Sequence, residues 1–216
     1  MQTDISLPAA ISGKTSACLD GLQMLSGAAL ILFMWCHMLL VGSVIIGPPV
    51  FDGVAGFLEA TYMAQLGGPL IVLVFLTHFL LGLRKIPVSS REQKAIWNQA
   101  RMLRHKDTWL WVVQAVSALV ILVMGSAHLW VILTDLPITA AKSAARIQGG
   151  FWCGFYLLLL PLAELHVGVG FYRIGVKWGL IGRGARKGFQ KIEYALTGAF
   201  ILIGLSALLK FLFLSI

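Results

Sequence analysis

Four histidines lie within long apolar stretches of the sequence, where ionisable side chains are rare. They are His37, His78, His128 and His166, and each belongs to a different stretch. Such a residue is costly in the hydrocarbon region of a membrane, so it is a functional candidate by default. Imidazole nitrogens are common ligands of haem iron, which makes cofactor chemistry the leading interpretation. Hydrogen bonds between helices are the alternative.

The stretches that carry these histidines predict membrane-spanning helices. Of the 216 residues, 58% are hydrophobic and only 12% are charged, a composition typical of membrane proteins. A helix of about 20 apolar residues crosses the roughly 30 Å of hydrocarbon. We therefore expect an all-α, polytopic membrane protein with a single domain, residues 1–216, built as a five-helix bundle. From the histidines we further expect this bundle to enclose two stacked b-type haems. The predicted helices cover residues 21–46, 62–86, 109–134, 149–175 and 192–216.

The basic residues between the predicted helices indicate the orientation of the chain. Seven Lys and Arg lie in the second connection and six surround the fourth, so both connections should face the cytoplasm under the positive-inside rule. This places the N-terminus in the cytoplasm. The net charge of +8 is then explained without nucleic acid, and soluble subunits could dock on the basic face. Residues 87–108 have the composition of an interfacial amphipathic helix or of an ordinary loop.

The predicted topology sorts the histidines into two layers. His37 and His128 lie past the middle of outward-running helices, whereas His78 and His166 lie near the inner ends of inward-running ones. The layers are separated by roughly 10 to 15 Å along the membrane normal. Two bis-histidine haems fit this arrangement, while a zinc or copper cluster would gather its ligands in one place. The three cysteines form no CxxCH motif, so covalent haem attachment is not expected.

Charged residues at the membrane edges are candidates for contact with the haem propionates, which need basic or hydrogen-bonding partners. Arg173, Lys177 and His105 are placed for the inner haem. Arg146 and Lys142 are the cations nearest the outer haem. Simple snorkelling of long side chains to the interface accounts for each of them equally well.

Two glutamates are candidates for proton chemistry. Glu164 lies deep in the fourth predicted helix, about 200° around the helix from His166, so it does not share the face of that histidine. A proton relay and a buried hydrogen bond both account for it. Glu59 precedes the second helix in an apolar outer segment. Quinol oxidation releases protons and would need such a carboxylate, although a solvated loop glutamate is the commoner case.

Four sequence strings resemble the di-haem cytochrome b anchors of quinol:fumarate reductases, in the succinate:quinone oxidoreductase superfamily. The strings are LGGP (66–69), LRHKDTWLW (103–111), MGSAHL (124–129) and AELHVGVGFYRIGVKWG (163–179). The resemblance extends over nearly the whole chain. It implies an oxidoreductase subunit of anaerobic respiration that oxidises menaquinol and transfers electrons through two haem b groups to an iron–sulfur subunit. Fumarate would be reduced on a flavoprotein subunit.

The resemblance also implies ligands for each haem. His78 and His166 would ligate the iron of the proximal haem, near the cytoplasmic partners. His37 and His128 would ligate the iron of the distal haem. These are the same pairs that depth in the membrane predicts.

Further site residues follow from the resemblance. Glu59 matches a glutamate needed for menaquinol oxidation, and Glu164 matches the family's transmembrane proton-pathway glutamate. Gln23, Trp111 and Lys177 match residues that contact the proximal haem propionates, although the family's serine after that glutamine is a methionine here.

The implied complex is a dimer of heterotrimers in the bilayer of the bacterial cytoplasmic (inner) membrane. The flavoprotein and iron–sulfur subunits would lie on its cytoplasmic side. Two alternatives stay open. One is the anchor of a succinate:quinone reductase that works in the opposite direction, and the other is a histidine-containing proton or metal transporter.

Overall fold

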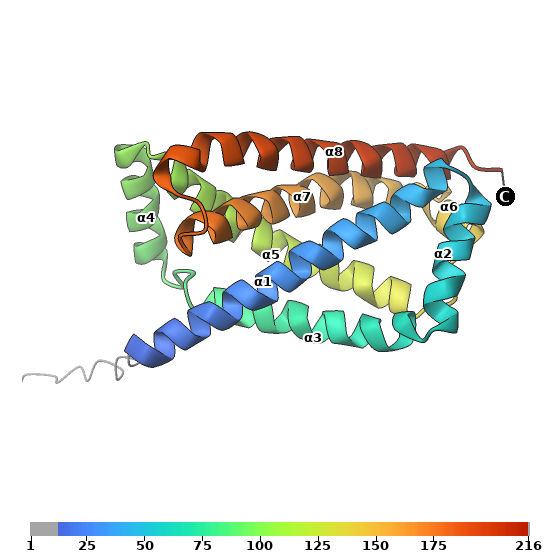
Figure 1. Ribbon diagram of the computed structural model, residues 1–216, viewed down its shortest axis with the longest axis horizontal. Helices are drawn as coiled ribbons and strands as arrows, with labels where there is room; N and C mark the ends of the chain where they lie inside the picture. The colour runs from blue at the N-terminus through green and yellow to red at the C-terminus, as the bar shows by residue number, and fades with distance from the viewer. Residues whose placement is uncertain (1–12, 216) are drawn as a thin grey trace, which may run out of the picture.

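Five long helices extend along the long axis of the molecule (Figure 1). The computed structural model describes residues 13–215, and within them each of the five is long and apolar enough to cross a membrane. The expected all-helical class with five candidate spans is therefore confirmed. The long helices are α1 (Gly13–Gly42), α3 (Met63–Leu83), α5 (Lys106–Leu133), α7 (Phe151–Lys177) and α8 (Arg186–Leu212).

Shorter helices lie across the two ends of the bundle (Figure 1). At one end are α2 (Pro48–Ala60) and α6 (Ala140–Gln148), and at the other is α4 (Ser90–Leu103). The remaining helical elements of residues 13–215 are two 3-10 turns, η1 (Ser43–Ile45) and η2 (Arg183–Ala185). From the sequence, residues 87–108 could form either an amphipathic helix or a loop. The structure shows that α4 lies within this segment.

Local interactions explain why α4 forms. The Oγ of Ser89 accepts a hydrogen bond from the backbone N–H of Glu92 and so caps a free donor of the first turn. Ala100 is fully buried, and Trp97 packs edge to face on Trp109 of α5 with ring centroids 5.4 Å apart. The helix is thereby anchored across the end of the bundle.

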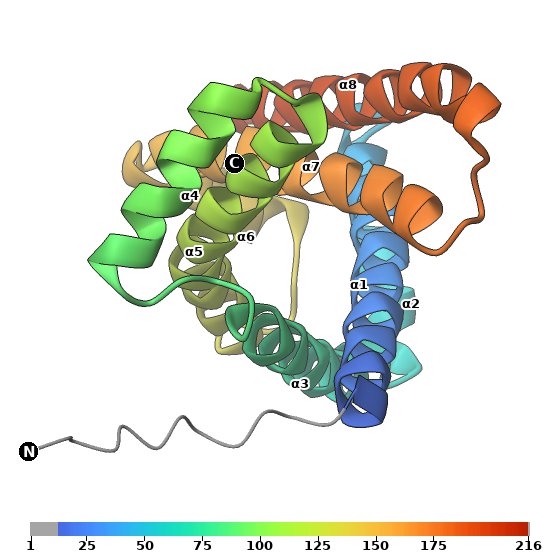
Figure 2. The same cartoon turned by 90° about the vertical axis from the view of Figure 1, so that its left-hand side faces the viewer.

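Four of the long helices form a closed ring. In the end-on view, α1, α3, α5 and α7 surround the centre of the molecule (Figure 2), and each packs against its two neighbours in that ring. Helix α8 lies outside the ring, where it packs along α7 and also contacts α1. The ring helices are the four that carry the histidines.

Glycines permit the close approach of α8 to the ring. A Cβ at Gly168 would overlap Thr197 and lie 2.5 Å from Oε1 of Glu193. A Cβ at Gly204 would lie 2.6 Å from Cδ1 of Leu160. Small residues at such contacts are typical of membrane helices, which associate through close packing.

The core is concentrated where α2, α6 and the end of α8 meet. Val44, Phe51, Ala144, Ile147 and Phe211 are buried there. Oδ1 of Asp52 in α2 accepts a hydrogen bond of 2.6 Å from the N–H of Ala140, which ties α2 to the start of α6. Elsewhere many large hydrophobic side chains are exposed, as expected for helices that face lipid.

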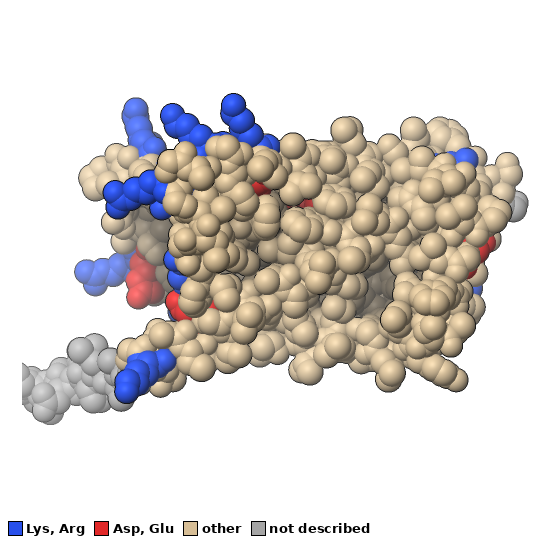
Figure 3. Space-filling view, viewed as in Figure 1, with Lys and Arg blue, Asp and Glu red and all other residues tan. Residues whose placement is uncertain are grey.

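Charge is distributed unequally between the two ends. Lys and Arg gather over the end where α4 lies, whereas the end formed by α2 and α6 shows few of them (Figure 3). This asymmetry is the one that predicts the cytoplasmic N-terminus, and the orientation itself stays a prediction.

The packing of α7 on α8 can be tested with two glycines of α7. Gly168→Ala should lower the free energy of unfolding by about 1 to 3 kcal/mol, because the added methyl group overpacks the contact with Thr197 and Glu193. Gly154→Ala is the matched control, since nothing lies within 4 Å of its Cβ position. Thermal unfolding in detergent measures both, and equal melting temperatures would contradict the proposed packing.

Candidate cofactor cavity

A cavity of about 390 Å³ lies inside the ring of α1, α3, α5 and α7. Its volume is within the range of cofactor sites, about 300 to 1,000 Å³. Within residues 13–215, no residue of α8 lines it. His37, His78, His128 and His166 all line it, one from each ring helix. The fold thus brings together four imidazoles that are far apart in the sequence.

His78 of α3 is oriented by a hydrogen-bond unit on α1. Its Nδ1 lies 3.2 Å from the carbonyl oxygen of Gln23 and 3.1 Å from Oγ of Ser26. The Ser26 hydroxyl donates to the same Gln23 carbonyl at 3.1 Å. Because a carbonyl oxygen can only accept, Nδ1 of His78 carries the proton and donates it. Nε2 is then left with a free lone pair, the form that binds a metal ion.

His166 of α7 has an equivalent unit on α5. Its Nδ1 lies 2.9 Å from Oγ of Ser117, and that hydroxyl donates to the carbonyl of Gln114 at 3.2 Å. The hydroxyl proton is used in that bond, so Oγ accepts the proton of Nδ1. Gln114 also donates from Nε2 to the carbonyl of His166 at 3.3 Å. His78 and His166 are therefore held in the same tautomer. In each case the partners are a Ser hydroxyl and the backbone carbonyl of the Gln three residues before it.

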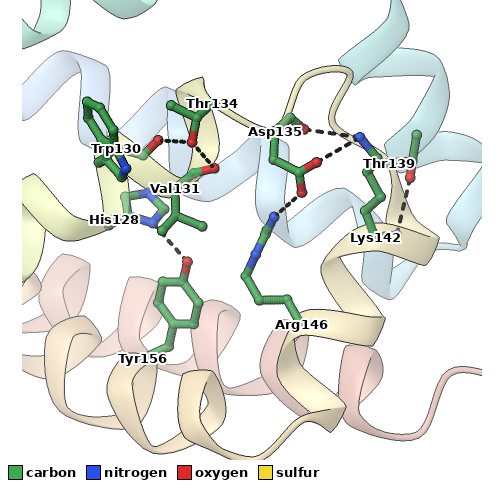
Figure 4. Close-up of polar contacts among 9 residues, drawn as sticks. All are labelled: His128, Trp130, Val131, Thr134, Asp135, Thr139, Lys142, Arg146 and Tyr156. Carbon is green, nitrogen blue, oxygen red and sulfur yellow. Dashed lines mark hydrogen bonds and ion pairs between the residues drawn. The ribbon is translucent and has the colours of Figure 1, made fainter.

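His37 of α1 and His128 of α5 lie close together in the cavity. Their ring centroids are 5.9 Å apart, and the ring planes are inclined by 65°. Nδ1 of His128 lies 2.9 Å from the hydroxyl of Tyr156, as the close-up shows (Figure 4), and His37 stacks on Phe33. Imidazole nitrogens lie about 2 Å from a bound metal such as zinc, so two rings on opposite sides of one ion have centroids about 6 Å apart. The observed separation matches that geometry.

The cavity mouth beside the end of α7 is lined by charged and polar residues. Gln23, Trp111, Arg173 and Lys177, all predicted from the sequence as propionate contacts, line the cavity. His105, predicted for the same role, does not. Its Nδ1 instead accepts the N–H of Asp107 at 3.3 Å and caps the start of α5.

At the opposite end of the molecule, the two cations predicted for the outer haem form ion pairs with Asp135. Asp135 accepts from Lys142 at 3.0 Å and from Arg146 at 2.6 Å (Figure 4). The Lys142 hydrogen bond is the main cause that lowers the pKa of Asp135, so the network stays charged at neutral pH and is lost only as the pH falls through that lowered pKa. Neither cation lines the cavity, but Arg146 lies beside Tyr156, the partner of His128 (Figure 4).

The two predicted glutamates lie outside the histidine cavity. Glu164 is buried, and its Oε1 has no hydrogen-bond partner within residues 13–215. It lies one helical turn from both Leu160 and Gly168, two α7 residues that contact α8, so it lies on the side of α7 that is turned toward α8. Glu59 is the last but one residue of α2 and is half-buried beside a small apolar pocket of about 40 Å³. That pocket is lined also by Leu40, Ala55, Leu58, Ala64, Leu136 and Ile138.

Three orienting groups of the site were not predicted: Ser26, Ser117 and Tyr156. A signal for the two serines was present, because each follows a glutamine by three residues within an apolar helix. Polar residues repeated at one spacing on two membrane helices indicate hydrogen bonding between helices. Nothing in the sequence pairs Tyr156 with His128, since that contact depends on how α5 and α7 cross.

Comparisons with known proteins agree on one family. A model described as "Succinate dehydrogenase/Fumarate reductase transmembrane subunit" matches residues 90–209. The chain is 34% identical over 197 residues to the fumarate reductase cytochrome b subunit of Helicobacter pylori strain J99, covering 87% of this chain and 77% of the relative. It is 31% identical over 205 residues to that of Wolinella succinogenes, covering 89% and 80%.

The serine partners provide a test of the inner histidines. In a metal-bound histidine, the second ring nitrogen usually forms a hydrogen bond with a neighbouring group. Removing that group typically lowers metal affinity 10- to 100-fold. Ser117→Ala should therefore weaken retention of the predicted inner haem by roughly that factor, because Nδ1 of His166 loses its acceptor. Ser206→Ala, at an exposed position of α8, is the control. Haem retention is measured by absorbance after competition with apomyoglobin, and identical retention in both variants would contradict the orienting role.

Proposed function

Because the chain belongs to the succinate dehydrogenase/fumarate reductase transmembrane subunit family, we propose that it is the menaquinol-oxidising cytochrome b anchor of a fumarate reductase. The resemblance found in the sequence is thereby confirmed at the level of the family. The observation that carries the finer proposal is the cavity lined by one histidine from each of four helices. In the proposed complex, an iron–sulfur subunit receives the electrons and a flavoprotein subunit reduces fumarate.

The residues of the cavity fit two haem b groups. His78 and His166 would hold the inner one, since both imidazoles leave Nε2 free for iron. His37 and His128 would hold the outer one, since their ring separation suits ligation of a single ion. Bound haem supplies one-electron transfer, and the protein supplies its position and surroundings.

The ends of the cavity would hold the haem carboxylates. We propose Gln23, Trp111 and Lys177 for the inner haem, with His105 at the same end of the molecule. Arg146 is proposed for the outer haem, because it lies beside Tyr156 and thus near His128 (Figure 4). Such contacts combine charge and hydrogen bonding and orient the ring within the bundle.

The quinol is proposed to bind near Glu59. This glutamate is half-buried beside the apolar side chains that line a small pocket, so a quinol ring could lie against those side chains from the lipid side while the carboxylate accepts its proton. The pocket itself, at about 40 Å³, does not hold the ring. A general base must be within hydrogen-bond reach of the proton that it removes. Glu164 is proposed as the proton-pathway residue, which its burial and its unpartnered oxygen support.

The end at which α4 lies is proposed to face the cytoplasm and the partner subunits. Lys and Arg gather there, as the positive-inside rule requires of the inner side (Figure 3). We propose the bacterial inner membrane as the location and a dimer of heterotrimers as the assembly. The described helices and the family support an integral membrane subunit.

The opposite direction of electron flow is the second candidate, because the family description names succinate dehydrogenase as well as fumarate reductase. The same four histidines would serve either direction. The transporter alternative has no support from the family.

The pairing of ligands predicts which haem each histidine variant loses. His78→Ala and His166→Ala should each abolish the absorbance of the same haem and spare most of the other, because a bis-histidine iron needs both rings. His37→Ala and His128→Ala should affect the other haem. Asn98→Ala, exposed on α4 and outside the cavity, should retain both. Optical difference spectra of the purified complexes measure this, and variants of one proposed pair that lose different haems would contradict it.

The role of Glu59 predicts a specific loss of quinol chemistry. Glu59→Gln should reduce menaquinol-dependent fumarate reduction by roughly 100-fold or more, because an amide cannot accept the proton. Fumarate reduction should persist when an artificial donor supplies electrons directly to the flavoprotein. Both haem spectra should also be retained. Glu92→Gln, exposed on α4, is the matched control. Full quinol-dependent activity in Glu59→Gln would rule out the proposed role.

A further inference from the structure

One carboxylate connects three helices at the cation-lined mouth of the cavity. Oδ1 of Asp20 on α1 accepts from Arg84 at 3.0 Å and from Lys85 at 2.8 Å, and both cations directly follow α3. Oδ2 accepts from Lys177, the last residue of α7, at 2.8 Å. Asp20, Lys85 and Lys177 themselves line the cavity.

The charges in this cluster do not balance. Three cations surround a single anion, so the group keeps two positive charges in excess. A haem carries two propionate carboxylates, and the excess equals their charge. Exposed ion pairs add little stability by themselves. A network of several charges can stabilise the fold, but stability alone does not require three cations on one anion, with two of the cations lining the cavity.

Without Asp20, the two lysines would repel each other. Burial is the largest effect on Lys85 and lowers its pKa; the hydrogen bond to Asp20 raises that pKa, and the charge of Lys177 lowers it. The carboxylate thus favours the charged form of Lys85, which burial and Lys177 disfavour. Its two oxygens hold Lys85 and Lys177 beside the cavity, between the ends of α3 and α7.

We propose that Asp20 is a positioning residue for the inner haem, which holds Lys85 and Lys177 at the cavity mouth to meet the haem carboxylates and offsets part of their positive field. The inference rests on the proposed haem function. Asp20 acts through the lysines and does not itself bind the cofactor. Its negative charge also disfavours adding an electron to the iron of the inner haem, and it should act less on the outer haem, whose proposed ligands lie at the other level of the cavity.

Replacing the carboxylate tests this directly. In the purified complex, Asp20→Asn should raise the midpoint potential of the inner haem, measured by spectroelectrochemical titration, and leave that of the outer haem unchanged. Lys85→Gln should shift the inner potential in the opposite direction. Asp20→Glu should restore a value near that of the parent protein, because the charge is kept. Glu92→Gln, an acid removed at the same end, should change neither haem.

The outcomes separate this inference from the proposed function. A parent complex without haem would overturn the proposed function as a whole. Two haems in the parent, with an unchanged inner potential in Asp20→Asn, would overturn only the role of Asp20, as would equal shifts of both haems. Loss of the inner haem in Asp20→Asn with retention in Asp20→Glu supports positioning. Loss of the inner haem in both variants would contradict it.

Discussion

Every polar group placed in the hydrocarbon region needs a partner, and this constraint shapes the interior of the protein. At the inner pair of histidines, the requirement is met on one side of each ring only. Ser26 with the Gln23 carbonyl, and Ser117 with the Gln114 carbonyl, take the Nδ1 protons and leave both Nε2 atoms without a hydrogen bond within residues 13–215. The protein itself therefore provides a hydrogen-bond partner for only one nitrogen of each ring, and both rings line a cavity whose residues suit a metal cofactor.

The arrangement of helices follows from the need to keep that cavity open. A ring of four helices leaves a central space, so much of the support must come from outside it. Helix α8 packs on α7 through Gly168 and Gly204, and α2 and α6 close the opposite end around Phe51 and Phe211. At the α4 end, Asp20 connects α1 to the ends of α3 and α7. Contacts at the outer surface of the ring and at its two ends therefore stabilise it, because few side chains meet at its centre.

The sequence was sufficient for the parts of the fold that depend on composition and periodicity. Long apolar stretches predicted the five candidate spans, and single histidines marked the four helices that form the ring. Helices α1 and α8 begin at Gly13 and Arg186, before the predicted apolar stretches, because polar residues can continue a helix beyond the hydrocarbon. Helices α2 and α6 were missed, because at 13 and 9 residues they are too short to stand out as membrane-spanning stretches. Asp20 and Tyr156 depend on contacts between distant segments, which no local pattern contains.

The number of haems per chain decides whether one ring of helices holds two bis-histidine cofactors. A pyridine haemochrome assay of the purified chain, combined with amino-acid analysis, gives this ratio together with the type of haem. Two b-type haems per chain are expected. One haem per chain would mean that the two layers of histidines do not both bind iron, and none would contradict the cytochrome function altogether.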